Sequence, residues 1–212
     1  MQTTRLTPDL IKEAKELISA FGLPIVDAPS EAEAQAAFMA KKKSVYGVIS
    51  QDFDSLLFSA PILVRNLTIS QKRKVAGVQI KTFPELIDLK ENLTVLGLDQ
   101  KQLIILAIMI GTDFNSQGIK GIGAKKGLKL LKERKDYDKL FEELKADFDW
   151  KKIYEVFENI PVTEEYKLEW QQVDEERIRK LLVDKHDFSL ERVEKIFDTI
   201  SDNKSKHKEQ TG

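Results

Sequence analysis

The spacing of apolar residues changes part-way along the chain. Up to about residue 90, stretches with apolar residues at helical spacing alternate with short apolar runs. This pattern predicts helices at 8–22 and 30–41 and buried strands at 24–26, 45–49 and 62–64. Because helices alternating with short apolar strands are typical of α/β proteins, we expect a parallel sheet with helices on its faces.

The second half of the chain has the pattern of helices only. Apolar residues repeat at helical spacing at 98–110, 124–134, 136–146, 149–158, 174–184 and 188–203. The segment 73–77 is expected to be a loop between sheet elements, and the polar tail at 204–212 is expected to be flexible. The predicted fold class is therefore α/β, with a sheet flanked by helices first and an all-helical part after it.

Composition narrows the class of protein. The 212 residues include no cysteine, which excludes disulfides and zinc–thiolate sites. Hydrophobic residues make up 42% and charged residues 33%, as in globular proteins. No apolar run approaches the roughly 20 residues that a membrane-crossing helix needs, and the first residues lack the apolar core of a secretory signal. We expect an intracellular protein that makes no contact with a membrane.

The charges are unevenly distributed along the chain. The net charge is −1, but 117–135 contains seven Lys or Arg and one Glu, a local charge of +6. The next stretch, 136–165, contains ten acidic and four basic residues, a local charge of −6. A concentrated basic patch is what a phosphate-binding face needs, although a solvated helix face would carry the same charges.

Acidic residues gather where predicted elements begin or end, at Glu31 and Glu33, at Asp52 and Asp54, and at Asp113. Each position also has a purely structural interpretation. Ser30 and Glu33 have the spacing of a capping box, Asp52 could cap a short helix at 55–58, and Asp113 could be a turn residue. Taken together, carboxylates without nearby His or Cys are the ligands that Mg²⁺ or Mn²⁺ prefers. Two such ions, about 4 Å apart, would activate water and stabilise the leaving oxygen in phosphodiester hydrolysis.

A glycine-rich segment, 118–123, lies between an apolar helix and a Lys-rich one. Glycines allow backbone N–H groups to approach a phosphate closely, and the following helix directs its positive N-terminus at the same place. This is the form of a helix–hairpin–helix phosphate clamp, with an ordinary glycine-rich turn as the alternative. The predicted DNA contacts are Lys120, Gly121, Gly123, Lys125, Lys126 and Lys129.

Five segments in this order resemble the XPG and flap-endonuclease family, especially its archaeal members. They are Ala28–Gln35, Ser50–Leu57, Val64–Leu67, Gly111–Asp113 and Gly118–Gly123, and the resemblance as a whole spans almost the whole chain. The resemblance implies an incomplete PIN-like 5′-nuclease core at 1–110, a helical DNA-binding region at 111–203 and a flexible tail at 204–212.

The family resemblance also implies an activity and its ligands. The family cuts branched DNA near the junction of a 5′ flap in replication and repair, as a 5′-flap endonuclease and 5′–3′ exonuclease. Carboxylates that match Glu31, Glu33, Asp52, Asp54 and Asp113 would hold two Mg²⁺ ions, directly or through water. Main-chain carbonyls that match Gly118, Ile119 and Ile122 would hold K⁺. The family often has Ser where this chain has Gly118, so a side-chain contribution is lost there.

The departures from the family pattern are large. Two further metal-site aspartates, a central strand and a helical arch would precede Met1, and Gln210–Gly212 resembles only the start of the motif that binds the sliding clamp PCNA. We therefore expect a fragment or one half of a split nuclease, with apolar sheet surface left uncovered, which self-associates or needs a separate N-terminal half. Without that half, the chain would be a non-catalytic duplex-binding module. A PIN-like ribonuclease is a more distant alternative, and an archaeal protein would be cytoplasmic, in the nucleoid.

Overall fold

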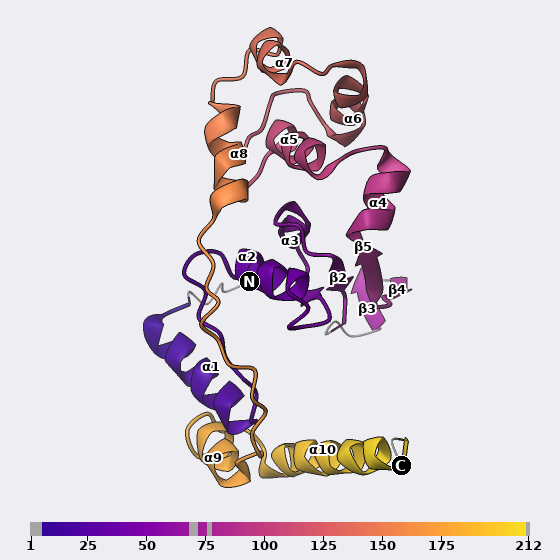
Figure 1. Ribbon diagram of the computed structural model, residues 1–212. Helices are drawn as coiled ribbons and strands as arrows, with labels where there is room; N and C mark the ends of the chain where they lie inside the picture. Colours follow the sequence, from indigo (N-terminus) through magenta and orange to yellow (C-terminus); the bar gives the residue numbers. More distant parts are fainter. Residues whose placement is uncertain (1–5, 68–71, 76–77, 211–212) are drawn as a thin grey trace. The chain divides into compact units, whose positions relative to one another are not determined.

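The computed structural model describes residues 6–67, 72–75 and 78–210 (Figure 1). The chain divides into two compact units, which we call the larger unit (Ala28–Glu164) and the smaller unit (Met1–Asp27 with Glu165–Gly212). This division differs from the one expected at 110–111. The reason is packing, because residues on both sides of that position belong to one hydrophobic core.

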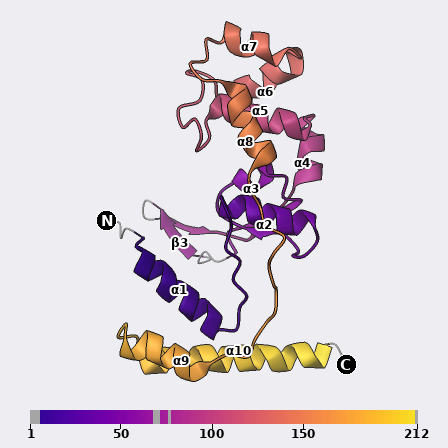
Figure 2. The ribbon, with the colours of Figure 1, turned by 60° about the vertical axis from the view of Figure 1, so that its left-hand side comes forward.

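The larger unit begins with helices and strands that alternate and ends with helices only, as Figures 1 and 2 show. Its elements are α2 (Ala32–Lys41), β1 (Val48–Ile49), α3 (Asp54–Leu57), β2 (Ile62–Arg65), β3 (Lys72–Val75), β4 (Val78–Lys81), β5 (Glu85–Asp88), α4 (Leu89–Leu96), α5 (Gln100–Ile110), α6 (Ala124–Glu133), α7 (Tyr137–Glu143) and α8 (Trp150–Asn159). In both views α5 to α8 gather at one end of the unit, and α2 lies with the strands at the other. The predicted class, a sheet flanked by helices and followed by a helical part, is confirmed.

The sheet itself is mixed rather than parallel. β1 and β2 pair in parallel, with Val48 opposite Leu63, but β5 pairs with β2 in the antiparallel direction, with Ile62 opposite Asp88. The chain reaches β5 from β2 through the separate antiparallel hairpin β3–β4 and not through a crossover helix. Strands joined without a crossover pair antiparallel, so the expectation of a parallel sheet holds for one pair only.

Three local predictions need correction. The segment 24–26 is not a strand, since it lies outside both sheets and its Ile25 side chain is exposed. The run 45–49 forms a strand only at its end, in β1. The expected loop at 73–77 is β3 as far as Val75, and residues 76–77 lie outside the described residues.

The helices of the second half follow the sequence prediction closely. All six predicted stretches are helical, but 174–184 divides into α9 (Glu175–Arg179) and a π-helical segment, η1 (Lys180–Asp184). The last helix, α10 (Leu190–Gln210), continues into the tail that was expected to be flexible. Helix α4 was not predicted.

No single helix in the described ranges is long and apolar enough to cross a membrane, and α4 with α5 would qualify only as a pair bent by 77°.

The smaller unit is built from α1 (Pro8–Ala20), α9, η1 and α10. Helix α1 begins as predicted, because the Thr7 hydroxyl accepts a hydrogen bond from the Leu10 amide at 3.3 Å. The smaller unit has a small hydrophobic core of its own. That core consists of Ala20, Ile178, Leu182, Val193 and Phe197.

Helix α5 is the centre of the core in the larger unit. It begins with a capping box, in which the Asp99 side chain accepts from the Gln102 amide and the Gln102 side chain accepts from the Asp99 amide. Ile105, Ile108 and Met109 are completely buried, so α5 is apolar on most of its circumference. The adjoining helix α6 packs closely because Gly127 faces the Leu106 side chain.

The glycine-rich segment folds back against the end of α5. The Ile119 amide donates to the Met109 carbonyl at 2.8 Å, which brings the segment close to the helix. At the point of closest approach Gly118 has a left-handed φ of +52°, and a Cβ there would lie 2.2 Å from the Ile110 carbonyl oxygen. Neither the dihedral angle nor the space suits another residue.

Gly118→Ala is therefore expected to destabilise the larger unit by at least about 2 kcal/mol, because the left-handed backbone alone costs about 1–2 kcal/mol for a residue with a Cβ. Gly123→Ala is the matched control, since Gly123 has φ of −107° and no atom lies within 4 Å of the place that a Cβ would occupy there. It should change stability by less than about 1 kcal/mol. Urea unfolding of both variants measures the difference in stability. Equal losses of stability would show that the left-handed φ and the close contact at Gly118 do not require a glycine.

Candidate active site

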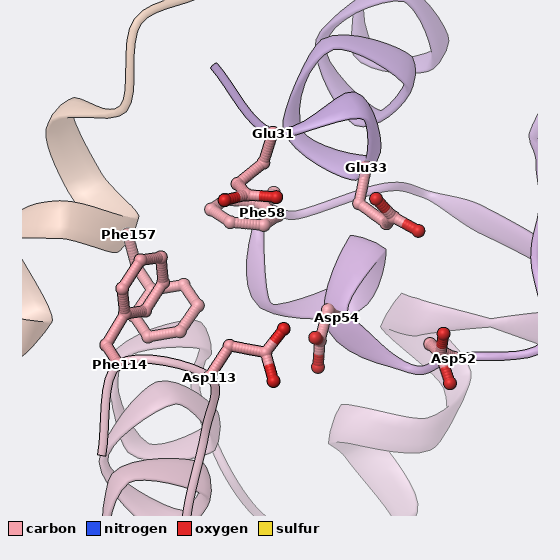
Figure 3. A pocket seen from close by; sticks show the side chains of 8 residues that line it. All are labelled: Glu31, Glu33, Asp52, Asp54, Phe58, Asp113, Phe114 and Phe157. Carbon is pink, nitrogen blue, oxygen red and sulfur yellow. The ribbon is translucent and has the colours of Figure 1, made fainter. Parts of the chain in front are cut away.

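Acidic side chains from three separate segments line a single pocket (Figure 3). Glu31 and Glu33 come from the start of α2, Asp52 from the turn after β1, Asp54 from the first position of α3, and Asp113 from the loop after α5. Figure 3 shows the carboxyl groups of Asp54 and Asp113 facing the same space, with the two glutamates above them. The structure thus brings all five predicted residues together. Their roles as metal ligands remain predictions.

The capping explanations for the acids at α2 and α3 do not hold, whereas Asp113 does stand in a turn, as its structural alternative predicted. Helix α2 has Glu31 and not Ser30 at its N-cap, and no side chain caps it, so the capping box is absent. Helix α3 has Phe53 at its N-cap, again without a side-chain hydrogen bond, so Asp52 is not a cap. Carboxylates that the helix ends do not use are available to bind something else.

The electrostatics of the pocket are unfavourable for the isolated chain. None of the five carboxylates forms an ion pair or accepts a side-chain hydrogen bond within the described residues. The pKa of Asp54 is raised, first because partial burial removes it from water and then because Asp113 and the other acids repel its charge. A positive ion in this pocket would relieve both effects.

The side chains are spread more widely than the ligands of one closed metal site. Among the described residues, no three Asp, Glu, His or Cys side chains are grouped closely enough to hold an ion by themselves. Magnesium nevertheless fits such a donor set, because it is commonly bound by one or two carboxylates together with water and substrate phosphate. All five side chains offer oxygen atoms, which hard cations prefer.

Aromatic side chains form one wall of the pocket, and sequence reasoning missed them. The Phe157 ring, on α8, lies 5.2 Å from the Phe58 ring and 5.3 Å from the Phe114 ring, measured between centroids. These rings form an apolar side of the pocket next to the carboxylates (Figure 3). Phe114 follows Asp113 directly and could have been noticed, but nothing near Phe157 in the sequence indicates a site.

The predicted phosphate clamp presents an open face. Gly121 has φ of +78° and, like Gly123, has no neighbouring atom within 4 Å of a Cβ position. Within the described part of the chain, the amides of these two glycines donate no hydrogen bond. Four nearby lysines are exposed, namely Lys120, Lys125, Lys126 and Lys129. Free amides at a helix N-terminus beside lysines are suited to an anion.

The potassium site that was predicted from main-chain carbonyls stays a prediction. Ile119 and Ile122 have buried side chains, which fix the path of the backbone between them. The Ile119 carbonyl accepts a hydrogen bond from the Ile122 amide at 3.0 Å and keeps a second lone pair. Gly118 lies at the start of the same turn.

An apolar hollow borders the carboxylate pocket and shares Asp54 with it. It is lined by residues of α3, β5, α4 and α5, including Leu57, Ile87 and Leu103. Phe53, which lines the hollow, is 51% exposed. On the sheet, Leu86 of β5 and Ile49 of β1 are each 57% exposed. Uncovered apolar surface in this region agrees with the sequence-based expectation, and the predicted self-association remains to be tested.

Comparison with known proteins places this arrangement in a family. Residues 22–113 match the family model of the XPG I-region. The chain is 54% identical over 194 residues to flap endonuclease 1 of Pyrococcus furiosus, and 52% identical over 195 residues to that of Thermococcus onnurineus. Each alignment covers 91% of this chain. The chain belongs to the XPG and flap-endonuclease family.

Solved structures of this family agree with the fold. Flap endonuclease-1 from Methanococcus jannaschii matches with a TM-score of 0.81 at 41% identity, over 91% of this chain and 57% of that one. The catalytic core of Rad2, in complex with DNA substrate, matches with a TM-score of 0.75 at 25% identity, over 92% and 70%. The chain spans 57% of the length of the two archaeal relatives named above.

The raised pKa of Asp54 predicts how stability depends on pH in the absence of divalent ions. The folded state holds the Asp54 proton more tightly than the unfolded state, so stability falls as pH rises from the ordinary value of 3.8 through the raised folded value. Asp54→Asn removes one repelling charge and should stabilise the chain at pH 7 by about 1 kcal/mol, the size of one solvated like-charge contact. This gain in stability should disappear below pH 3.8, the ordinary pKa of the aspartate side chain.

Thermal unfolding in EDTA at pH 3 and pH 7 measures this effect. Asp147→Asn is the matched control, because Asp147 is exposed and forms no ion pair among the described residues. Equal melting temperatures for Asp54→Asn and Asp147→Asn at pH 7 would show that the five carboxylates do not repel one another.

Proposed function

We propose that this chain is the metal-binding and duplex-binding part of a structure-specific 5′-flap endonuclease, which hydrolyses phosphodiester bonds in branched DNA. The observation that carries the proposal is the convergence of five carboxylates on one pocket, which form no ion pair in the described part of the chain and are joined by a short loop to an open glycine hairpin. The family relatives named flap endonuclease 1 support it, as does the Rad2 core that was solved with DNA substrate.

The two parts of the site have complementary tasks. The hairpin amides and the lysines of α6 would bind the backbone of the duplex without reading its sequence. The carboxylates would hold divalent ions, and these ions supply charge neutralisation and water activation at the scissile phosphate. Phe58, Phe114 and Phe157 would limit water on one side, which strengthens the electrostatic attraction between the carboxylates and a bound cation.

The cofactors and the DNA substrate follow from the same residues, and the protein partners are proposed from the family resemblance. We propose Mg²⁺ as the ion of the carboxylate pocket, with Mn²⁺ as a substitute, because all the donors are oxygens. K⁺ is proposed at the carbonyls of Gly118, Ile119 and Ile122. Flapped double-stranded DNA is the proposed substrate. A sliding clamp of the PCNA type and a separate N-terminal half are the proposed protein partners.

A second candidate function is a duplex-binding module without turnover. The observation that favours it is the wide spread of the carboxylates, because no three acidic side chains among those described surround a single ion. Such a site would bind Mg²⁺ weakly until another segment added ligands. The hairpin does not depend on that segment and would bind DNA in either case.

One experiment separates the two candidates. A labelled 5′-flap oligonucleotide is incubated with Mg²⁺ and the chain, with and without an added N-terminal half from an archaeal relative. Cleavage near the junction, in either reaction, supports the nuclease. Salt-sensitive duplex binding without cleavage in both reactions supports the binding module. Preferential cleavage of structured RNA would contradict both and favour a PIN-like ribonuclease.

Asp54→Ala and Asp113→Ala are expected to abolish cleavage in the complemented protein while duplex affinity stays within about twofold. Both remove a proposed metal ligand and leave the hairpin intact. Rates fall by roughly 100-fold or more when charge stabilisation at a reacting centre is lost. Single-turnover cleavage and fluorescence anisotropy measure the two quantities. The control is Asp198→Ala, because Asp198 is an exposed residue of α10 that forms no ion pair among the described residues. Unaltered cleavage rates would refute the metal assignment.

Gly121→Val is expected to weaken duplex binding by about tenfold or more, comparable to losing one hydrogen bond to a charged group. The side chain would cover the face from which a phosphate approaches. Because Gly121 has a left-handed φ, Gly123→Ala is the companion variant that adds a methyl group without backbone strain. Both should keep their Mn²⁺ affinity. Parent-like duplex affinity in both variants would show that DNA does not bind at the hairpin.

A further inference from the structure

The loop that carries Asp113 is held by two neighbouring side chains. The Asn115 side-chain oxygen accepts from the Thr112 amide at 3.2 Å and from the Thr112 hydroxyl at 2.6 Å. The Thr112 hydroxyl oxygen in turn accepts from the Phe114 amide at 3.2 Å. The amides on both sides of Asp113 are therefore fixed by side chains, and we call Thr112 with Asn115 the loop clamp.

The Asp113 carboxylate itself has no such support. It forms no hydrogen bond or ion pair with another described residue, and it is exposed on the surface of the pocket. Its position relative to Asp54 consequently depends on the backbone of the loop. The loop clamp fixes that backbone at residues 112 and 114.

The loop clamp also joins the loop to the buried helix and to the hairpin. The Asn115 side-chain amide donates to the Ile108 carbonyl of α5 at 2.7 Å. The Asn115 carbonyl accepts from the Gly118 amide at 2.9 Å. One residue thus connects the most deeply buried helix, the loop of the carboxylate site and the start of the glycine hairpin.

We propose that Thr112 and Asn115 are positioning residues that hold the Asp113 carboxylate at a fixed place relative to both the other acids and the hairpin. This inference rests on the proposed nuclease function. Loosening the clamp should weaken metal binding. It should also make the distance between the bound duplex and the cleaved phosphate variable. Residues that orient a metal ligand without touching the metal commonly change metal affinity by about 10-fold to 100-fold when they are removed.

Thr112→Val is the sharpest test, because it keeps the side-chain shape and removes only the hydroxyl. Both backbone bonds that anchor the hairpin, Gly118 to Asn115 and Ile119 to Met109, remain possible. Thr112→Ser restores the hydroxyl and is the rescue variant. Thr94→Val is the matched control, since the Thr94 hydroxyl donates to the Lys90 carbonyl in α4, away from the pocket lining.

Two readouts on the 212-residue chain do not require turnover. Mn²⁺ titration followed by electron paramagnetic resonance should show about tenfold weaker binding for Thr112→Val and an affinity within about twofold of the parent for the other two variants. Amide hydrogen exchange should rise at residues 112–115 in Thr112→Val alone. Duplex affinity should be the same for all four proteins.

A third readout uses the protein complemented with an N-terminal half. Thr112→Val should lower kcat with little change in KM for the flap substrate, because the hairpin still grips the duplex. Its cuts should spread over neighbouring phosphates, and Thr112→Ser should restore a single cut. A destabilised but correctly positioned site would lose activity without moving the cut.

The possible outcomes separate the two proposals. Parent-like exchange and parent-like Mn²⁺ affinity in Thr112→Val would overturn the positioning role while leaving the nuclease proposal intact. Absence of Mn²⁺ binding in the parent and of cleavage in the complemented protein would overturn the nuclease proposal, and with it the inference. Faster exchange together with weaker Mn²⁺ binding and a spread of cuts supports the positioning role.

Discussion

The C-terminus of α5 is the constraint on which the rest of the site depends. A helix leaves its last carbonyl groups without partners inside the helix, and burial makes such groups costly. Here Ala107, Ile108 and Met109 receive hydrogen bonds from Gly111, from the Asn115 side chain and from Ile119. Satisfying the end of one buried helix therefore determines the path of both the Asp113 loop and the glycine hairpin.

A rigid helix end explains how an unfavourable cluster of charges can persist in a folded chain. Five carboxylates that form no ion pair with the described residues reduce stability, and only well-packed surroundings keep them together. The packing is visible around the pocket, where six of the eleven residues of α5 are buried and the Phe58 and Phe157 rings are in contact. The repulsion lowers stability at the place where a cation is proposed to bind. The packing of the neighbouring core compensates for this loss.

The sequence was sufficient for the features that depend on local pattern. Helix spacing predicted α1, α2 and α5 to α8, and the positions of the acids at element ends predicted that they could converge. The sequence was insufficient where a partner distant in the chain determines whether a segment forms a strand. The run 24–26 has the composition of a strand but no neighbouring strand to pair with, whereas Lys72–Val75 is highly charged and still pairs with β4. The caps assigned to Ser30 and Asp52 failed because the helices begin one or two residues away.

The aromatic wall shows most clearly what local pattern omits. Phe157 reaches the pocket because α8 packs against α5, and the segment after α8 is fastened to α2 by two hydrogen bonds between the buried Gln35 side chain and the Thr163 backbone, at 2.9 and 2.8 Å. Gln35 stands in the same helix as Glu33, yet its partner lies 128 positions further along the chain. Only the folded chain reveals that the glutamates of α2 and the ring of α8 belong to one site, because the contact that joins them has no signature in either segment alone.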